Sequence, residues 1–197
     1  MFHAQRTTTS RLATGAAVGL LALASLSGCA LVQTAPPAAL TGVAACAQGK
    51  TWNLDVPALG TAVQAELATR NIVATVVAEG SQSLSWTVEG KIEMQTDYTL
   101  TITSGTPEAQ TIVVDKHTGP STGIAYVNAE VAIPRNWDAS DLEHTTTATV
   151  AGATPEELPY TLTNTDIDDS VGVELTCDGG TMTTHQRGSD LTLNWTS

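Results

Sequence analysis

Alternation of apolar and polar side chains is the feature that most constrains the fold of this chain. Its longest example covers residues 91–103, where the apolar side chains fall on alternate positions: Ile92, Met94, Tyr98, Leu100 and Ile102. Because side chains on a β-strand point alternately to opposite faces, this period predicts a strand with one buried face. Half-buried strands are typical of antiparallel sheets, so we expect antiparallel pairing.

Similar short runs continue almost to the end of the chain. We expect strands at residues 72–78, 83–88, 91–103, 111–116, 123–133, 143–150, 159–163, 171–177, 181–186 and 191–196. Turn-forming residues separate them, among them Glu89-Gly90, Thr118-Gly119-Pro120 and Pro134-Arg135-Asn136. A short helical turn is also possible at residues 138–141. So many closely spaced strands predict a strongly bent antiparallel sheet or a barrel of about eight to ten strands.

One helix is expected before the strands, at residues 56–70. Asp55 can cap its first turn, and Pro57 lies where a missing N–H costs nothing. One face carries an apolar stripe made of Val56, Leu59, Val63 and Leu67. The predicted fold class is therefore mainly β, with one N-terminal helix packed on the bent sheet, because neither element can bury its apolar face alone.

The first 28 residues have the parts of an export signal. Arg6 and Arg11 precede an uncharged run at residues 12–26, rich in Ala, Leu and Gly. That run is shorter than the roughly 20 residues that a membrane-spanning helix needs. An ordinary signal peptide and a transmembrane helix are two interpretations of this segment.

Leu26-Ser27-Gly28-Cys29 follows this run and resembles the lipobox of bacterial lipoproteins. The resemblance implies that Cys29 receives a diacylglyceryl group and that residues 1–28 are removed. It also implies a location on the extracytoplasmic face of the cell membrane, held by the lipid. We therefore expect a leader at 1–28, a membrane-tethering linker at 29–48 and a single β-rich domain at 49–197.

Charge and cysteine content bear on partners and on compartment. The chain has a net charge of −12, and all its acidic residues follow residue 28. Such a surface repels nucleic acid, so no nucleic-acid partner is expected. Once Cys29 is lipidated, Cys46 and Cys177 remain, and an oxidising compartment predicts a disulfide between them. Two separate buried thiols are the alternative.

Candidate chemical groups are few. Asp166, Asp168 and Asp169 could offer oxygen ligands to Ca²⁺, but they do not fit an EF-hand loop, and an acidic solvated loop is the simpler interpretation. His117, His144 and His185 fall on or beside different predicted strands with no neighbour at i, i+2 or i, i+4, which predicts scattered surface histidines. We therefore expect no metal site, no cofactor and no catalytic residues.

Aromatic residues and the end of the chain bear on ligand binding. Trp52, Trp86, Tyr98, Tyr126, Trp137, Tyr160 and Trp195 could fill the core or line an apolar pocket, with Trp137 the one most exposed. The segment from Cys177-Asp178-Gly179-Gly180 to Leu191-Thr192-Leu193-Asn194-Trp195 is similar to the closing hairpin of lipocalin-like bacterial lipoproteins. The alternative to such a barrel is an open antiparallel sheet wrapped on the helix, as in lipid-carrying cell-envelope lipoproteins.

Two functions are compatible with these features. The first is a non-enzymatic surface lipoprotein that binds an envelope protein or a small molecule. The alternative is a lipocalin-like carrier of a lipid or another apolar ligand. An enzyme is not expected, since no G-x-S-x-G, H-E-x-x-H or phosphate-cradling motif is present.

Overall fold

The computed structural model describes residues 39–153, 155, 157–158, 162 and 167–197. Cys29, the leader and most of the expected linker lie outside the described residues, as does all of the strand expected at 159–163 except residue 162. None of the described helices is both long and apolar enough to cross a membrane.

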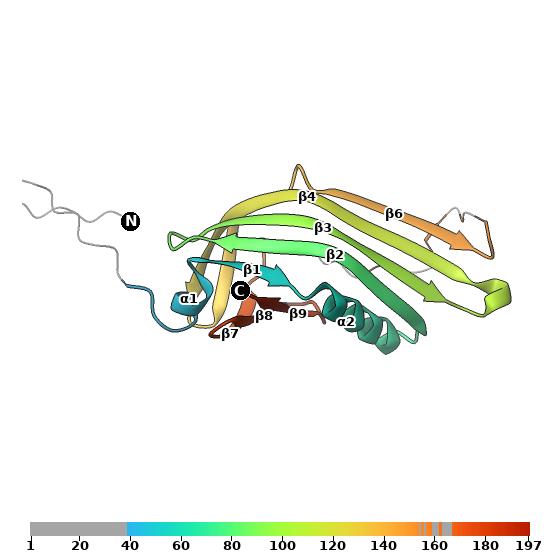
Figure 1. The fold of residues 1–197 in the computed structure, drawn as a ribbon, viewed down its shortest axis with the longest axis horizontal. Helices are drawn as coiled ribbons and strands as arrows, with labels where there is room; N and C mark the ends of the chain where they lie inside the picture. The colour runs from blue at the N-terminus through green and yellow to red at the C-terminus, as the bar shows by residue number, and fades with distance from the viewer. Residues whose placement is uncertain (1–38, 154, 156, 159–161, 163–166) are drawn as a thin grey trace, which may run out of the picture. The chain divides into compact units, whose positions relative to one another are not determined.

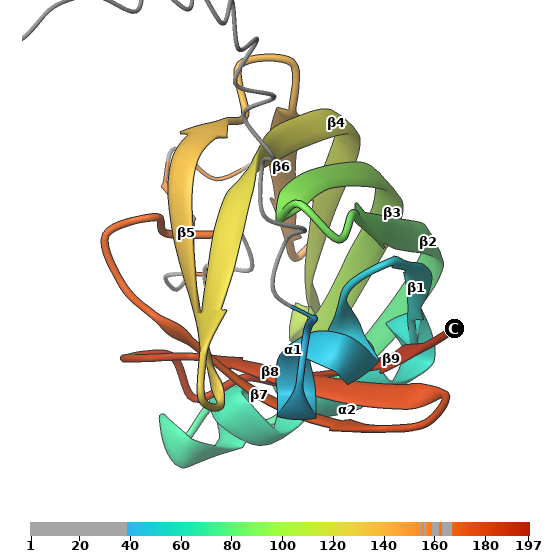
Figure 2. The same cartoon turned by 90° about the vertical axis from the view of Figure 1, so that its left-hand side faces the viewer.

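Nine strands in the described residues form one antiparallel sheet that curves into a ring (Figures 1 and 2). They are β1 (Lys50–Leu54), β2 (Ala74–Trp86), β3 (Lys91–Ser104), β4 (Thr111–Asn128), β5 (Val131–Asp138), β6 (Glu143–Val150), β7 (Val173–Asp178), β8 (Thr181–Gln186) and β9 (Thr192–Thr196). The strand order is β3-β2-β1-β9-β8-β7-β5-β4-β6, and β3 also pairs with β4. That pairing closes a ring of all strands except β6, which extends the sheet beside β4.

Long and short strands have different roles in this ring. β2, β3 and β4 continue well past the short strands β7, β8 and β9, as Figure 1 shows. β6 lies along the first part of β4 in this extension, with Thr111 opposite Val150 and Thr118 opposite Glu143. From Thr122 onward, the same edge of β4 pairs with β5 instead. The inner face of the extension is therefore built by β2, β3, β4 and β6.

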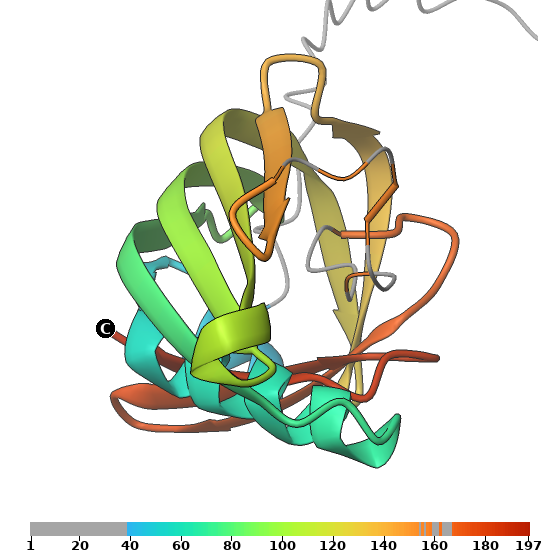
Figure 3. The same cartoon turned by 90° about the vertical axis from the view of Figure 1, so that its right-hand side faces the viewer.

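The expected helix is α2, which covers Val56–Thr69. The Asp55 side chain accepts a hydrogen bond from the Ala58 N–H, as a helix cap does. The apolar stripe is buried in one core with Trp86 and Leu100 of the sheet. Gly60 brings α2 close to β2, because a Cβ at Gly60 would lie 2.9 Å from the Ala78 Cβ. Below the long strands, α2 lies beside β2 (Figures 1 and 3).

A second helix, α1 (Gly42–Ala47), precedes β1 and was not expected from the sequence. Ala47 is fully buried, and its carbonyl accepts a hydrogen bond from Trp52 Nε1 at 2.8 Å. Trp52, also fully buried, is on β1, a strand that the sequence analysis did not include. The structured region therefore includes residues that the sequence assigned to the linker.

Cys46 and Cys177 form the expected disulfide, which joins α1 to β7 with an S–S distance of 2.01 Å and Cα atoms 5.9 Å apart. The two cysteines are separated by 131 positions in the chain. For a loop of this length, the chain-entropy model gives a stabilisation of roughly 4–5 kcal/mol. The bond thus holds the beginning of the domain against a strand near its end.

Several ends of strands expected from the sequence are wrong, because in the structure a single strand continues through each of them. The strands expected at 72–78 and 83–88 are replaced by one strand, β2 at Ala74–Trp86, which passes through Gly80 with a φ of 110°. Residues 118–120 lie inside β4, where Gly119 has a φ of 124° and a Cβ would lie 2.1 Å from the Asp141 carbonyl oxygen. The glycines allow a local change of backbone direction while the ladder with β3 continues.

The Pro134-Arg135-Asn136 segment is also part of a strand rather than a turn. β5 carries one extra residue opposite β4, since Thr122 pairs with Asp138 while Ile124 pairs with Arg135. Asn136 adopts a φ of 51° within this bulge. Residues 139–142 form a turn, closed by the Leu142 N–H to the Ala139 carbonyl, and not a helical segment.

The burial of α2 generates a first prediction. Leu67 is fully buried, so Leu67→Ala should lower the free energy of unfolding by roughly 2–5 kcal/mol, measured by urea denaturation. Val73→Ala is the matched control, because Val73 is 88% exposed just after the same helix, and its change should stay within about 0.5 kcal/mol. Equal stability of the Leu67→Ala and parent proteins would show that α2 is not part of the core.

Candidate functional site

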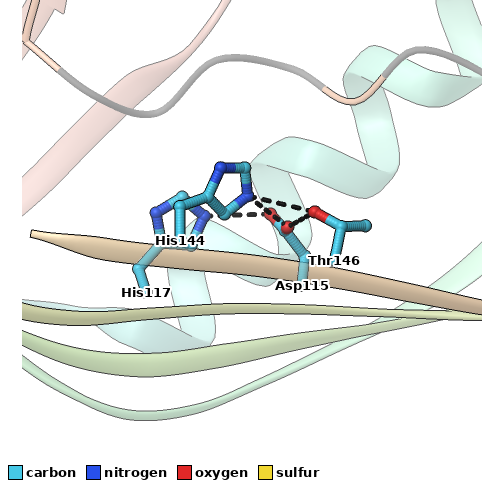
Figure 4. Close-up of polar contacts among 4 residues, drawn as sticks. All are labelled: Asp115, His117, His144 and Thr146. Atoms are coloured by element: carbon cyan, nitrogen blue, oxygen red, sulfur yellow. Dashed lines mark hydrogen bonds and ion pairs between the residues drawn. The ribbon is translucent and has the colours of Figure 1, made fainter.

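Polar side chains gather on the inner face of the extended sheet. Asp115 and His117 are two residues apart on β4, so both point to the same face, and both are buried. β6 is paired with this part of β4, which sets Thr146 opposite Asp115 and His144 opposite His117. Figure 4 shows the four side chains directed toward one another; we call them the Asp–His cluster.

The Asp115 carboxylate is the centre of the Asp–His cluster. Its Oδ2 lies 2.9 Å from His117 Nε2, and its Oδ1 lies 2.6 Å from His144 Nε2 and 2.6 Å from Thr146 Oγ1. An ionised carboxylate can only accept hydrogen bonds, so both imidazoles donate from Nε2 and Thr146 donates its hydroxyl proton. Three donors from two strands therefore converge on one carboxylate.

This network determines the charge of Asp115. Burial acts to raise the pKa of the carboxyl group, because Asp115 is only 2% exposed. Hydrogen bonds from His117, Thr146 and His144 act in the opposite direction and hold the pKa at about 2. The carboxylate is therefore ionised at neutral pH, as a buried negative charge stabilised by the groups around it.

Ring stacking fixes the orientation of the two imidazoles. The rings of Tyr98 and His117 have centroids 4.8 Å apart, and those of His117 and His144 are 4.3 Å apart, each pair inclined by 20°. The three residues belong to the neighbouring strands β3, β4 and β6 and are opposite one another in register. Stacking across the sheet thus presents the Nε2 atoms of both histidines to the same carboxylate.

The expectation of scattered surface histidines is wrong for His117 and His144. His117 is 3% exposed and is stacked on His144 in the Asp–His cluster. Only His185 is separate, with its Nδ1 3.2 Å from the Leu191 carbonyl oxygen. The sequence does contain a usable signal, since Asp115 and His117 are at i, i+2, as are His144 and Thr146. The expected strand ended at residue 116, so this spacing was not recognised as one face.

The acidic group at residues 166–169 does not form a ligand set in the described residues. The Asp168 carboxylate accepts hydrogen bonds from the N–H and hydroxyl of Ser170 two residues later, which lower its pKa. That is a local turn in which the carboxylate is occupied by the chain itself. Asp166 lies outside the described residues.

Inside the ring there is a small apolar cavity of about 80 Å³. Its wall includes Trp86, Met94, Trp137, Leu175 and Trp195. Sites for drug-sized ligands measure about 300–1,000 Å³, so the aromatic and aliphatic side chains largely fill the ring. The expectation that Trp137 is the most exposed aromatic residue is wrong: its ring lies over Gly123, while Tyr126 is 60% exposed.

The cavity and the Asp–His cluster are separate places on the inner face. A row of three residues opposite one another, Gln82 on β2, Thr96 on β3 and Gly119 on β4, lies between them in the register of the sheet. Gln82 Nε2 donates a hydrogen bond of 3.0 Å to Thr96 Oγ1, and both residues are buried. This polar row, in which Gln82 also borders the cavity, thus separates the cavity from the cluster, while the apolar core continues beyond the cluster at Ile102 and Val113.

The geometry of the Asp–His cluster does not match nucleophilic catalysis. In a catalytic triad, one imidazole nitrogen faces the nucleophile and the other faces the carboxylate. Here Thr146 Oγ1, at 3.1 Å, and Asp115 Oδ1 both contact the same nitrogen, His144 Nε2. This arrangement is suited to holding a cation or a polar ligand group.

Comparison of the chain with protein-family models, with curated proteins and with solved structures finds no match.

The cluster generates a second prediction. Asp115→Ala removes the acceptor of three donors, and the buried His117 donor left without an acceptor should by itself cost about 1–3 kcal/mol of unfolding free energy. Chemical denaturation with a chelator present measures this cost. Asp138→Ala is the control: that carboxylate is exposed and accepts hydrogen bonds from the nearby Ser140, so the change should be clearly smaller. Similar losses in both variants would mean that the Asp–His cluster does not contribute specially to stability.

Proposed function

We propose that this chain is a lipid-anchored binding module on the extracytoplasmic face of the cell membrane, and that it binds a partner without transforming it. Its partner is an envelope protein or a small molecule. Cys29 would carry the lipid, and a short linker would connect it to the folded domain. The Cys46–Cys177 disulfide supports a location outside the cytoplasm, because such bonds persist in oxidising compartments.

The observation that carries the choice of a binding module is the filled ring. A carrier of the lipocalin kind needs an interior that accepts its ligand, and the cavity of about 80 Å³ holds little more than a few water molecules. An acyl chain would require the tryptophan side chains that line it to move. Recognition at the surface or at the Asp–His cluster requires no such rearrangement.

Asp115 Oδ1 and Thr146 Oγ1 both contact the same nitrogen, His144 Nε2. This geometry supports binding rather than catalysis at the Asp–His cluster. The acidic charge of the chain favours a cationic or basic partner over nucleic acid or an anionic lipid surface.

Membrane anchoring is tested by Cys29→Ala. Without the acceptor of the lipid, the protein should be released from the membrane fraction or accumulate as an uncleaved precursor, because acyl chains supply the affinity. Immunoblotting of fractionated cells measures both outcomes. Ser27→Ala is the matched control, since a small residue stays in the lipobox and the protein should remain bound to the membrane. Unchanged fractionation and normal processing of Cys29→Ala would contradict the lipoprotein proposal.

The choice between module and carrier is tested by native mass spectrometry of the protein extracted from membranes. A binding module with a filled interior should give the mass of the lipidated chain without a retained lipid. A reproducible extra mass, identified as a lipid or another apolar molecule and lost when Ala132→Trp narrows the cavity, would favour the carrier alternative.

A further inference from the structure

The Asp–His cluster contains the ligand types that divalent transition metals prefer. Asp115, His117 and His144 each offer one ligand atom, and these atoms all lie within 4.8 Å of one another. Two imidazoles and one carboxylate suit Zn²⁺ and neighbouring transition metals, whereas Ca²⁺ and Mg²⁺ prefer oxygen ligands alone. We propose that Asp115, His117 and His144 form a binding site for one zinc-like divalent cation.

The distances fit such a site after a small movement. Ligand atoms about 2.0–2.1 Å from a tetrahedral zinc ion are about 3.3 Å apart. Without a cation, the carboxylate oxygens lie 2.9 Å from His117 Nε2 and 2.6 Å from His144 Nε2. Entry of the ion therefore requires these oxygen and nitrogen atoms to separate by less than about 1 Å. Any ligand atoms near the 4.8 Å limit of the set would have to move closer together, by about 1.5 Å at most.

His144 is the ligand that can make this movement. Its side chain is 46% exposed, whereas those of Asp115 and His117 are almost fully buried. The buried pair would form the fixed part of the site, and His144 would close over the ion from the solvent side. The stack of Tyr98, His117 and His144 keeps both rings directed to the same point during this step.

Metal binding also requires a change in the position of two protons. Each imidazole donates from Nε2 in the absence of metal, and a metal ligand must offer a lone pair there. The Nε2 proton of each imidazole would have to move to Nδ1, and the ionised carboxylate would supply the negative charge. The Thr146 hydroxyl, 2.6 Å from Asp115 Oδ1, would continue to orient the carboxylate as an outer partner.

The position of His144 argues against a purely structural network. Asp115 already accepts hydrogen bonds from His117 and Thr146, which bring it two donors. A further bond from a half-exposed imidazole adds little stability, because water competes for both groups. A cation would give this third, converging side chain a direct role.

Three protein ligands leave one position of a tetrahedral ion for water or for a ligand group of a partner. The exposed side of His144 is where such a group can reach the ion. The bound ion would then be the point at which the Asp–His cluster contacts the partner of the binding module. The proposal does not depend on the lipid anchor, so its failure would leave the membrane attachment untouched.

The test is isothermal titration of Zn²⁺ into the purified full-length lipoprotein in detergent, freed of metal by a chelating resin and carrying no polyhistidine tag. We expect one ion per chain, with no comparable binding of Ca²⁺ or Mg²⁺. His144→Gln should weaken Zn²⁺ binding by at least about 100-fold, since even outer-shell partners typically account for 10–100-fold. Because His144 is half exposed, this variant should keep its fold, which circular dichroism checks.

Two further variants complete the experiment. Asp115→Asn keeps the shape of the side chain but removes its charge, and it should weaken Zn²⁺ binding to a similar extent. His185→Gln is the matched control: His185 also lies on a strand but outside the Asp–His cluster, so its Zn²⁺ affinity should equal that of the parent. Co²⁺ bound in place of Zn²⁺ should give the visible absorption of a tetrahedral site, lost in His144→Gln. Absence of Zn²⁺ binding by the parent, or equal affinity in the folded His144→Gln and His185→Gln proteins, would overturn the proposal.

Discussion

Pairing of β3 with both β2 and β4 is the constraint on which the rest of this structure depends. It joins β3, at one end of the strand order, to β4, next to the other end, and closes the ring, so that the apolar faces of its strands enclose a common interior. A sheet edge left open would expose unpaired N–H and C=O groups, and closure removes that cost along β3 and β4. Because β2, β3 and β4 are longer than the strands on the opposite side, closure also leaves an extension whose inner face needs other cover.

One element covers this extension, and another widens its sheet. α2 packs against β2, where Val76 N–H also donates a hydrogen bond to Gln64 Oε1 on the helix. β6 pairs with the first part of β4 and brings His144 and Thr146 to Asp115. The change of partner on this edge of β4 occurs around Gly119, whose backbone lies against the turn that connects β5 to β6. The Asp–His cluster thus exists because one long strand has two successive neighbours on the same edge.

The inner face is divided by chemistry. One part is an apolar ring with tryptophans around a small cavity, and the other sets a buried carboxylate with three hydrogen-bond donors among apolar side chains such as Leu100 and Val113. A buried negative charge is costly unless its neighbours stabilise it, and here β3, β4 and β6 together provide the surroundings. This division is why we assign binding chemistry to the Asp–His cluster and core formation to the ring.

Local patterns in the sequence determined much of the fold. Alternating side chains predicted most of the strands, with residues 143–150 and 181–186 correct to the residue, and Asp55 with its apolar stripe predicted α2. The cysteine content predicted the disulfide. These features depend on a repeat of two or 3.6 residues, on a cap, or on a count, all of which can be found along the chain. The turns predicted at Gly119, Pro120 and Pro134 are wrong. Turn-forming residues also occur at bulges and at changes of pairing partner inside long strands.

The Asp–His cluster was decided by the tertiary structure. Asp115 and His117 share a face through local spacing, but His144 is 27 positions further along the chain than His117, and nothing local indicates that β6 returns to β4 in this register. A shift of one residue would turn His144 to the other face and remove it from the cluster. Strand pairing between distant segments is a property of the closed sheet, so the strands could be predicted from the sequence while the site they build could not.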